Sequence, residues 1–348
     1  MSEATASKIP VTVLTGYLGA GKTTLLNRIL SENHGKKYAV IVNEFGEIGI
    51  DNDLIIGADE EVFEMNNGCI CCTVRGDLVR IMDGLMKRKG KFDAIIVETT
   101  GLADPAPVAQ TFFVDEDVQK NARLDAVVTV ADAKWLADRL KDAPEAKNQI
   151  AFADVIVLNK TDLVTKPELA EVEARIRGIN PYAKLHRTER CSVALADVLD
   201  RGAFDLDRIL DIEPDFLEVD DHDHDHDHHH GHDHHHHHDH GHGLKHYHDE
   251  DMQSLSLKTD KPLDPNVFMP WLQNLVQVEG GKILRSKGIL AFHDDDDRYV
   301  FQGVHMMLEG NHQRKWKDGE PRESRLVFIG RELPEKAIRE GFESCIVS

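Results

Sequence analysis

The stretch Gly16-Tyr-Leu-Gly-Ala-Gly-Lys-Thr23 matches the pattern G-x-x-x-x-G-K-[ST]. It follows an apolar run at 11–15 and precedes the helix-like stretch 25–30. Glycines in such a loop let backbone N–H groups wrap a phosphate at a helix N-terminus, where the dipole also favours an anion. The Lys22 ammonium then reaches the β- and γ-phosphates, and the Thr23 hydroxyl binds Mg²⁺. We expect the nucleotide to contact Gly16, Tyr17, Leu18, Gly19, Ala20, Gly21, Lys22, Thr23 and Thr24.

Short apolar runs alternate with amphipathic stretches over about the first 210 residues. Near-continuous apolar runs are typical of parallel strands buried on both faces, and they occur at 11–15, 38–42, 94–97, 126–130 and 155–158. Between them, apolar residues recur at helical spacing, most clearly over 78–86. This alternation predicts a doubly wound, mostly parallel α/β domain over 8–212.

The tetrapeptide Asn159-Lys-Thr-Asp162 directly follows the last of these runs. A carboxylate such as that of Asp162 accepts two hydrogen bonds from the N1–H and amino groups of guanine, and adenine offers no such pair of donors. We therefore predict that Asn159, Lys160 and Asp162 select GTP. A small-molecule P-loop kinase is disfavoured because it has no need of guanine recognition.

The segments after two other strands carry acidic residues. Glu98 ends the run at 94–97 and is expected to support Mg²⁺ or its waters, with the Gly101 N–H sensing the γ-phosphate. The second such segment, 43–51, is the expected place of another nucleotide-responsive loop, and the sequence does not rank its acidic residues. The catalytic candidates are Lys22, Glu98, Glu44 and Asp51, and Glu47 is a candidate metal ligand.

Three cysteines lie close together in Cys69-Ile-Cys71-Cys72. Thiolates bind Zn²⁺, Co²⁺ or Cu⁺ in preference to Mg²⁺, and three protein ligands leave a tetrahedral ion one position short. An open position suits transfer of the ion better than permanent binding. Since this cluster lies in the chain between the two expected nucleotide-responsive segments, we predict that it holds Zn²⁺ or Co²⁺ and responds to the nucleotide.

Sixteen of the 21 histidines lie between His222 and His248, interleaved with aspartates. Imidazoles bind zinc, cobalt, nickel and copper, so this tract is expected to hold metal weakly at many exchangeable sites. With almost nothing to bury, 213–252 is predicted to be a disordered linker. Beyond it, 253–348 is predicted to form a smaller α+β domain, with strands at 254–257, 288–292, 299–306 and 325–329 and helices at 265–276 and 334–342.

Composition excludes several classes of protein. The formal net charge of −21 argues against a nucleic-acid binder, even after the −9 of residues 220–251 is set aside. No apolar run approaches the roughly 18 residues of a membrane span, and the first residues lack the pattern of a signal peptide. Five cysteines, three of them clustered, indicate thiols in a reducing compartment, and we predict a cytoplasmic protein.

Taken together, the motifs resemble the CobW-like family of metallochaperone GTPases, and most closely its zinc-regulated GTPase metalloprotein activators. The resemblance rests on the phosphate loop, the cysteine cluster, the tetrapeptide at 159–162 and the stretches 43–46, 98–105, 301–305, 316–318 and 325–331. It implies a CobW C-terminal-like domain, GTP hydrolysis, metal held by Cys69, Cys71 and Cys72, and transfer of that metal to a client metalloenzyme.

The leading hypothesis is therefore a GTP-hydrolysing metallochaperone that delivers zinc or cobalt when the nucleotide state changes. A metal-buffering or storage protein with a regulatory GTPase is one alternative, and a cobalt chaperone for cobalamin synthesis is another. The expected cofactors are GTP, Mg²⁺ and Zn²⁺ or Co²⁺. The expected partner is a client metalloenzyme, with no nucleic acid and no membrane, and formation of a homo-oligomer is left open.

Overall fold

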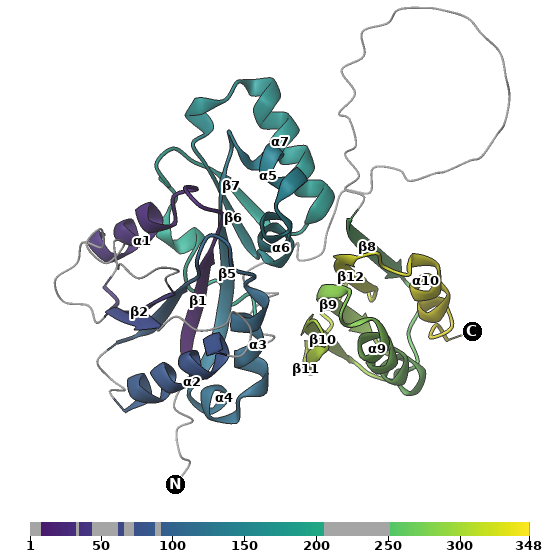
Figure 1. The fold of residues 1–348 in the computed structure, drawn as a ribbon. Helices are drawn as coiled ribbons and strands as arrows, with labels where there is room; N and C mark the ends of the chain where they lie inside the picture. Colours follow the sequence, from purple (N-terminus) through teal and green to yellow (C-terminus); the bar gives the residue numbers. More distant parts are fainter. Residues whose placement is uncertain are drawn as a thin grey trace, which may run out of the picture.

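The computed structural model describes residues 8–32, 35–43, 62–65, 73–87, 92–204 and 251–347, which form two sheets with their helices (Figure 1). Several predictions lie outside the described residues, namely those on Glu44, Glu47, Asp51, Cys69, Cys71, Cys72 and the tract from His222 to His248. No helix in the described part of the chain combines the length and hydropathy needed to cross a membrane.

The first sheet has seven strands in the order β3-β2-β4-β1-β5-β6-β7, all parallel. Its strands are β1 (Ile9–Thr15), β2 (Tyr38–Asn43), β3 (Val62–Met65), β4 (Ala94–Glu98), β5 (Ala122–Asp132), β6 (Val155–Asn159) and β7 (Lys184–Arg187). The helices are α1 (Lys22–Ser31), α2 (Thr73–Met86), α3 (Ala106–Val114), α4 (Glu116–Asn121), α5 (Leu136–Asp142), α6 (Pro144–Phe152) and α7 (Lys166–Ile179). This architecture confirms the predicted doubly wound α/β class.

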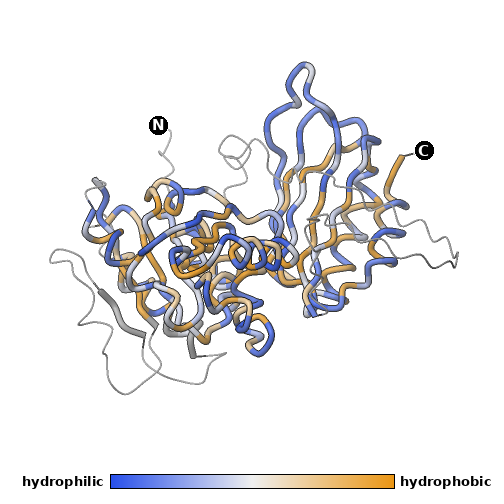
Figure 2. The backbone as a smooth tube through the Cα atoms, turned by 90° about the horizontal axis from the view of Figure 1, so that it is seen from above, coloured by the Kyte–Doolittle hydropathy of each residue, from blue (hydrophilic) through white to orange (hydrophobic). Residues whose placement is uncertain are grey.

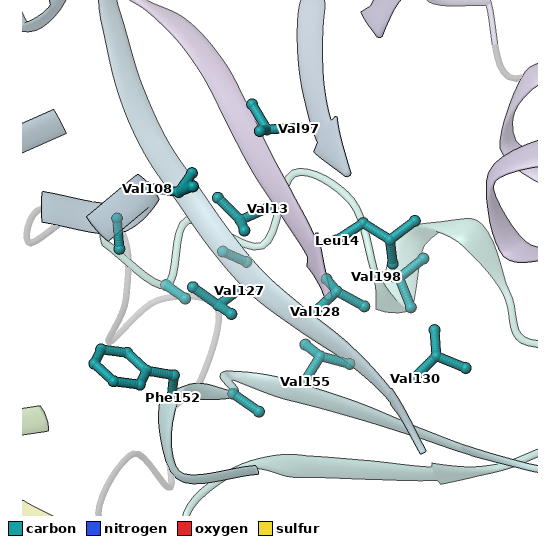
Figure 3. Close-up of a cluster of buried hydrophobic side chains, with 14 of the residues drawn as sticks. Val13, Leu14, Val97, Val108, Val127, Val128, Val130, Phe152, Val155 and Val198 are labelled. Carbon is teal, nitrogen blue, oxygen red and sulfur yellow. The ribbon is translucent and has the colours of Figure 1, made fainter. Parts of the chain in front are cut away.

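The strand interiors are apolar because both faces of the sheet are covered. Successive side chains of a strand point to opposite faces. In Figure 3, Val13 and Val127 lie toward Phe152 of α6, whereas Leu14 lies toward Val198 on the other face. All five of these side chains are buried. This double burial explains why the strands are mostly apolar and show no regular alternation of polar and apolar residues.

The second sheet is antiparallel, with five strands in the order β11-β10-β9-β12-β8. They are β8 (Met252–Thr259), β9 (Ile283–Ala291), β10 (Asp297–Val304), β11 (Met307–Lys315) and β12 (Ser324–Arg331). Helices α9 (Pro265–Glu279) and α10 (Glu335–Glu343) complete a core of their own. In both domains hydrophobic stretches of the chain, drawn in orange, run through the interior, and many hydrophilic stretches lie at the periphery (Figure 2).

Two predictions for this α+β domain were wrong in detail. The strand predicted at 299–306 ends at Val304, because His305 has φ of 51° and starts a tight turn that pairs Val304 with Met307. The chain returns as β11, a half-exposed polar strand that was not predicted. The strand predicted at 288–292 begins five residues earlier, at Ile283.

The two sheets share an interface that is partly charged and partly apolar. Asp154, just before β6, accepts hydrogen bonds from Arg285 Nη2 at 2.8 Å and Lys287 Nζ at 2.7 Å, both on β9. The Asp154 and Arg285 side chains are 4% and 3% exposed. The Arg285 guanidinium lies 4.2 Å from the centre of the Phe204 ring. Apolar residues of the second sheet, including Ile329, join the core of the first domain, so the domains are packed against each other.

Candidate functional site

The candidate site lies at the carboxyl edge of the parallel sheet, where ligands bind in open α/β folds. The phosphate-loop sequence follows β1, and Glu98 ends β4. Asp132 and Asn159 end β5 and β6 and stand side by side in register. Parallel pairing therefore brings the predicted nucleotide residues from several distant segments to one edge.

The phosphate loop has little space for side chains and a backbone suited to glycine. Gly16, Gly19 and Gly21 have φ of 140°, 76° and 119°, in the left-handed region that glycine tolerates best. A Cβ on Gly16 would lie 2.2 Å from the Val130 carbonyl oxygen, and one on Gly21 would lie 2.6 Å from Asn159 Nδ2. The loop is thus held against β5 and β6, and its close contacts explain the glycines at its two ends.

Lys22 opens α1 and points back across the loop. Its Nζ donates a hydrogen bond to the Gly16 carbonyl at 2.8 Å, and Gly21 forms the N-cap of the helix. Thr23 follows in the first helical turn and is half-buried. An anion within this loop would meet the ammonium together with the N–H groups at the helix N-terminus.

The oxygen donors at this edge fit Mg²⁺ in kind. Mg²⁺ takes hard oxygen ligands and usually keeps several waters. The Thr23 hydroxyl and the Glu98 carboxylate, 6% exposed at the end of β4, are donors of this type. Next to Glu98, Thr99 Oγ1 donates to Thr15 Oγ1 at 2.8 Å and fixes the end of β4 to the end of β1. Thr23 and Glu98 are therefore the residues that would hold the ion or its waters.

Asn159 joins the phosphate loop to the segment after β7. Its Nδ2 donates to the Ala20 carbonyl at 2.9 Å. Its Oδ1 accepts from the Cys191 N–H at 2.8 Å and from the Thr188 hydroxyl at 3.2 Å. Asn159 is 2% exposed, so these bonds satisfy a buried amide and at the same time fix two loops.

Lys160 bridges the loop and β5. It has φ of 61°, and its Nζ donates to the Gly19 carbonyl and to Asp132 Oδ2, both at 2.7 Å. Asp162, in the 3₁₀ turn Thr161–Leu163, is exposed beside this bridge. The Lys160 ammonium thus connects the phosphate loop to β5. The Asp162 carboxylate is exposed at the edge of the site.

The segment after β4 lies against the phosphate loop. A Cβ on Gly101 would lie 2.6 Å from the Leu18 backbone nitrogen. Any side chain at position 101 would therefore collide with the phosphate loop, so the close packing of these two segments requires glycine there.

An apolar cavity of about 150 Å³ lies on the α5–α6 side of Tyr17 and Leu18, and its wall includes Trp135 but none of residues 159–162.

Sequence reasoning missed two residues of this network. Asp132 carries no motif, and Cys191 lies far from the cysteine cluster in the sequence. Cys191 is buried, and its thiol donates to the Gly21 carbonyl at 3.4 Å. Burial raises the pKa of this thiol to about 11, although the charges of Arg28 and Lys160 oppose the shift. The sequence offered no direct signal for Cys191, because β7, which places this turn at the nucleotide edge, is a short polar strand without an apolar run.

The predicted zinc or cobalt ligands lie outside the described residues. Within 8–32, 35–43, 62–65, 73–87, 92–204 and 251–347, no three His, Cys, Asp or Glu side chains group in a way that could hold a metal ion. The flanks of the cysteine cluster are described. The chain leaves β3 at Met65, on the same edge as the phosphate loop, and α2 begins at Thr73.

A glycine-rich loop between β1 and α1 of a parallel sheet, with a second antiparallel domain packed against it, defines a two-domain P-loop α/β protein. Residues 10–187 match the family model "CobW/HypB/UreG, nucleotide-binding domain", and residues 252–346 match "Cobalamin synthesis protein cobW C-terminal domain". The chain belongs to the CobW/HypB/UreG family.

The sequence is similar to known proteins over most of its length. The chain is 34% identical to the "Zinc chaperone YjiA" of Escherichia coli, over 96% of this chain and 98% of that one. It is 35% identical to "Zinc-regulated GTPase metalloprotein activator 1" of Schizosaccharomyces pombe, over 88% and 78%. The crystal structure of Zn(II)-bound YjiA GTPase from E. coli superposes with a TM-score of 0.74 at 28% identity, covering 98% of this chain and 100% of that one.

Proposed function

We propose that this protein is a GTP-hydrolysing metallochaperone that holds zinc at Cys69, Cys71 and Cys72 and releases it to a client metalloprotein when GTP is hydrolysed. One observation carries the proposal. The cysteine segment connects Met65 and Thr73, and Met65 ends at the sheet edge that also carries the phosphate loop. The segment that carries the three cysteines therefore leaves the sheet from the edge that carries the phosphate loop. Relatives named as zinc chaperones and as metalloprotein activators support it.

The nucleotide half of the proposal assigns roles to described residues. Lys22 neutralises the β- and γ-phosphates from within its loop. The Asp162 carboxylate selects guanine by accepting hydrogen bonds from the N1–H and amino groups of the base. Bound Mg²⁺ supplies charge neutralisation at the phosphates. Gly101 offers its N–H to the γ-phosphate from its position against Leu18. Hydrolysis removes that contact, so the 101–104 segment loses a partner in the GDP state.

The metal half concerns the cargo ion. Three thiolates bind Zn²⁺ strongly and leave one of four tetrahedral positions for a ligand from the client. If GTP orders the segments that flank the cluster in the sequence and thereby raises zinc affinity, zinc must tighten GTP binding by the same factor. A client that supplies further ligands can take the ion after hydrolysis. Cobalt satisfies the same ligands, so a cobalt chaperone for cobalamin synthesis remains the alternative cargo assignment.

A competition titration tests the proposal. Zn²⁺ or Co²⁺ is titrated against a chelator with the protein loaded with GDP or with a non-hydrolysable GTP analogue. We expect the affinities to differ by roughly 5- to 150-fold, as is typical of coupled sites. The Cys71→Ser variant should lose the Co²⁺–thiolate absorption band while keeping its nucleotide affinity. Equal metal affinities in both nucleotide states would overturn gated delivery.

The histidine tract favours a second candidate, a metal-buffering role. Sixteen histidines between His222 and His248 can hold many exchangeable ions in addition to the ion held by the thiolates. Deleting 222–248 should lower total metal capacity and leave one tight, thiolate-bound ion with unchanged GTP turnover. Loss of the tight ion in the deletion variant would mean that the tract supplies its ligands.

We further propose that the chain divides into a GTPase domain at 8–212, a linker at 213–252 and a C-terminal domain at 253–348. We also propose that the protein is cytoplasmic.

A further inference from the structure

The segment after β4 is held from the side by helix α6. Gln149 Nε2 donates hydrogen bonds to the Gly101 and Ala103 carbonyls, each at 3.1 Å. Gln149 is 1% exposed, so these bonds are shielded from water. The next contact along the segment comes from the neighbouring residue of α6, because Asn148 Nδ2 donates to Asp104 Oδ2 at 2.8 Å. The position of Gly101 is therefore tied to α6.

Asn148 also faces the second domain. Its Oδ1 accepts a hydrogen bond from Arg331 Nη2 at 2.6 Å. The orientation of the Asn148 amide is fixed, since a guanidinium only donates and a carboxylate only accepts. The other Asp104 oxygen accepts from the Ala106 N–H at 2.9 Å, in the first turn of α3. A continuous set of hydrogen bonds thus runs from Arg331 through Asn148 to Asp104.

Arg331 is anchored in its own sheet. It is the last residue of β12, and its N–H donates to the Lys282 carbonyl at 2.9 Å. Its guanidinium lies near a second contact between the domains. Lys147, beside Asn148, pairs with Asp251 at 2.9 Å and lowers the pKa of that carboxyl, and the charge of Arg331 lowers it further. The backbone of Arg331 is thus fixed within the second domain, and its guanidinium is presented to α6.

We propose that Arg331 is a positioning residue for the GTPase site: through Asn148 and Asp104 it holds Gly101 where the γ-phosphate is met. The inference rests on the proposed role of Gly101. Because Gly101 already lies against Leu18, the Arg331 contacts favour the position that binds GTP. GDP has no γ-phosphate, so its affinity is independent of them. By linkage, GTP strengthens the contact between the domains.

The test compares affinities for GDP and for a non-hydrolysable GTP analogue, using wild type, Arg331→Gln and Asn148→Asp. The aspartate variant keeps the bond to Arg331 but places a carboxylate against Asp104. Both variants should bind the analogue roughly 2- to 30-fold more weakly, the range seen for mutations that alter coupling. GDP affinity should stay near the wild-type value, and Arg331→Lys should recover part of the loss.

Lys287→Gln is the matched control. It also removes an ion pair between the domains, with Asp154, but at the opposite end of β6 from the site. It should leave the ratio of the two affinities unchanged. An unchanged ratio in Arg331→Gln and Asn148→Asp, or an equal loss for GDP and the analogue, would overturn the positioning role. Failure of the proposed function is recognised separately, since wild type itself would then either not bind the analogue or bind metal equally in both nucleotide states.

Discussion

Asn159 and Cys191 lie 32 residues apart in the chain and meet at the nucleotide edge, where the Cys191 N–H donates to Asn159 Oδ1 at 2.8 Å. The same asparagine holds the Ala20 carbonyl with its other amide atom. One buried side chain thereby fixes the phosphate loop relative to the turn after β7. The relative position of these two loops determines the distance between the phosphate and base ends of the proposed site.

Replacement of Asn159 by alanine should loosen both loops. The variant leaves the buried Ala20 carbonyl and the Cys191 N–H without their partner, and each such loss costs about 1–3 kcal/mol. We expect a lower free energy of unfolding in a urea titration and weaker binding of both GDP and GTP. Thr188→Val, which removes the longer bond to Asn159 and a 3.4 Å bond to the Leu158 carbonyl, should have a smaller effect. Equal stability of Asn159→Ala and wild type would contradict this account.

Replacement of Asp162 by asparagine should reduce the preference for guanine. The amide presents a donor where the carboxylate accepts two hydrogen bonds, so GTP should lose about tenfold or more in affinity relative to xanthosine triphosphate. Fluorescent nucleotide competition measures the ratio. Lys22→Ala serves as the contrasting variant, because it should weaken all triphosphates alike and abolish turnover. If ATP competes equally with GTP for wild type, the role given to Asp162 is wrong.

The Cys191 thiol should be unreactive in the folded protein. Burial raises its pKa to about 11, so almost no thiolate is present at pH 8. Iodoacetamide labelling followed by peptide mass analysis should leave Cys191 unmodified in the native state and modify it in urea. Rapid native labelling would mean that the turn after β7 opens away from Gly21.

The same thiol predicts a pH dependence of stability. Its ordinary pKa is 9.0, so between about pH 9 and pH 11 the unfolded chain loses a proton that the folded chain keeps. The free energy of unfolding should therefore fall as the pH rises through this window. Cys191→Ala should show a shallower fall than wild type in urea titrations at pH 8 and pH 10. An identical slope in both proteins would contradict the assignment.

Asp154 should be the most sensitive charged residue of the domain interface. Removing it leaves the buried Arg285 guanidinium without its carboxylate, and breaking a buried pair in this way costs roughly 3–5 kcal/mol. Asp154→Ala should therefore melt well below wild type. Arg285→Met removes the buried cation and leaves Asp154 paired with Lys287, so its loss should be smaller. Calorimetry that ranks the two variants in the reverse order would contradict this account.

The sequence predicted those elements whose physical cause is local. Fully buried parallel strands need continuous apolar runs, so β1 and β6 could be recognised directly. Strands β7 and β11 could not, because they are half-exposed and carry polar residues such as His186 and His312, which show no simple period. Here pairing with a neighbouring strand, rather than side-chain pattern, determines the structure.

The residues of the candidate site also fall into those that a local sequence pattern predicts and those that it does not. Lys22 and Asp162 belong to motifs whose spacing is itself the signal. Asp132 is one of 62 acidic residues, and its pairing with Lys160 depends on the register of β5 and β6. The bond between Arg331 and Asn148 joins residues 183 positions apart, and no local pattern indicates it. Contacts of this kind arise only when the two domains pack together.

The shared interface has a consequence for how the chain could be divided. Asp154, Arg285 and the apolar side chains around Ile329 join the halves through buried contacts, independently of the peptide connection between Phe204 and Asp251. Halves produced as two polypeptides should therefore reassociate into one particle, as in a split-protein complementation assay. The residues between those two points are then free to change in length and composition during evolution without altering the architecture on either side.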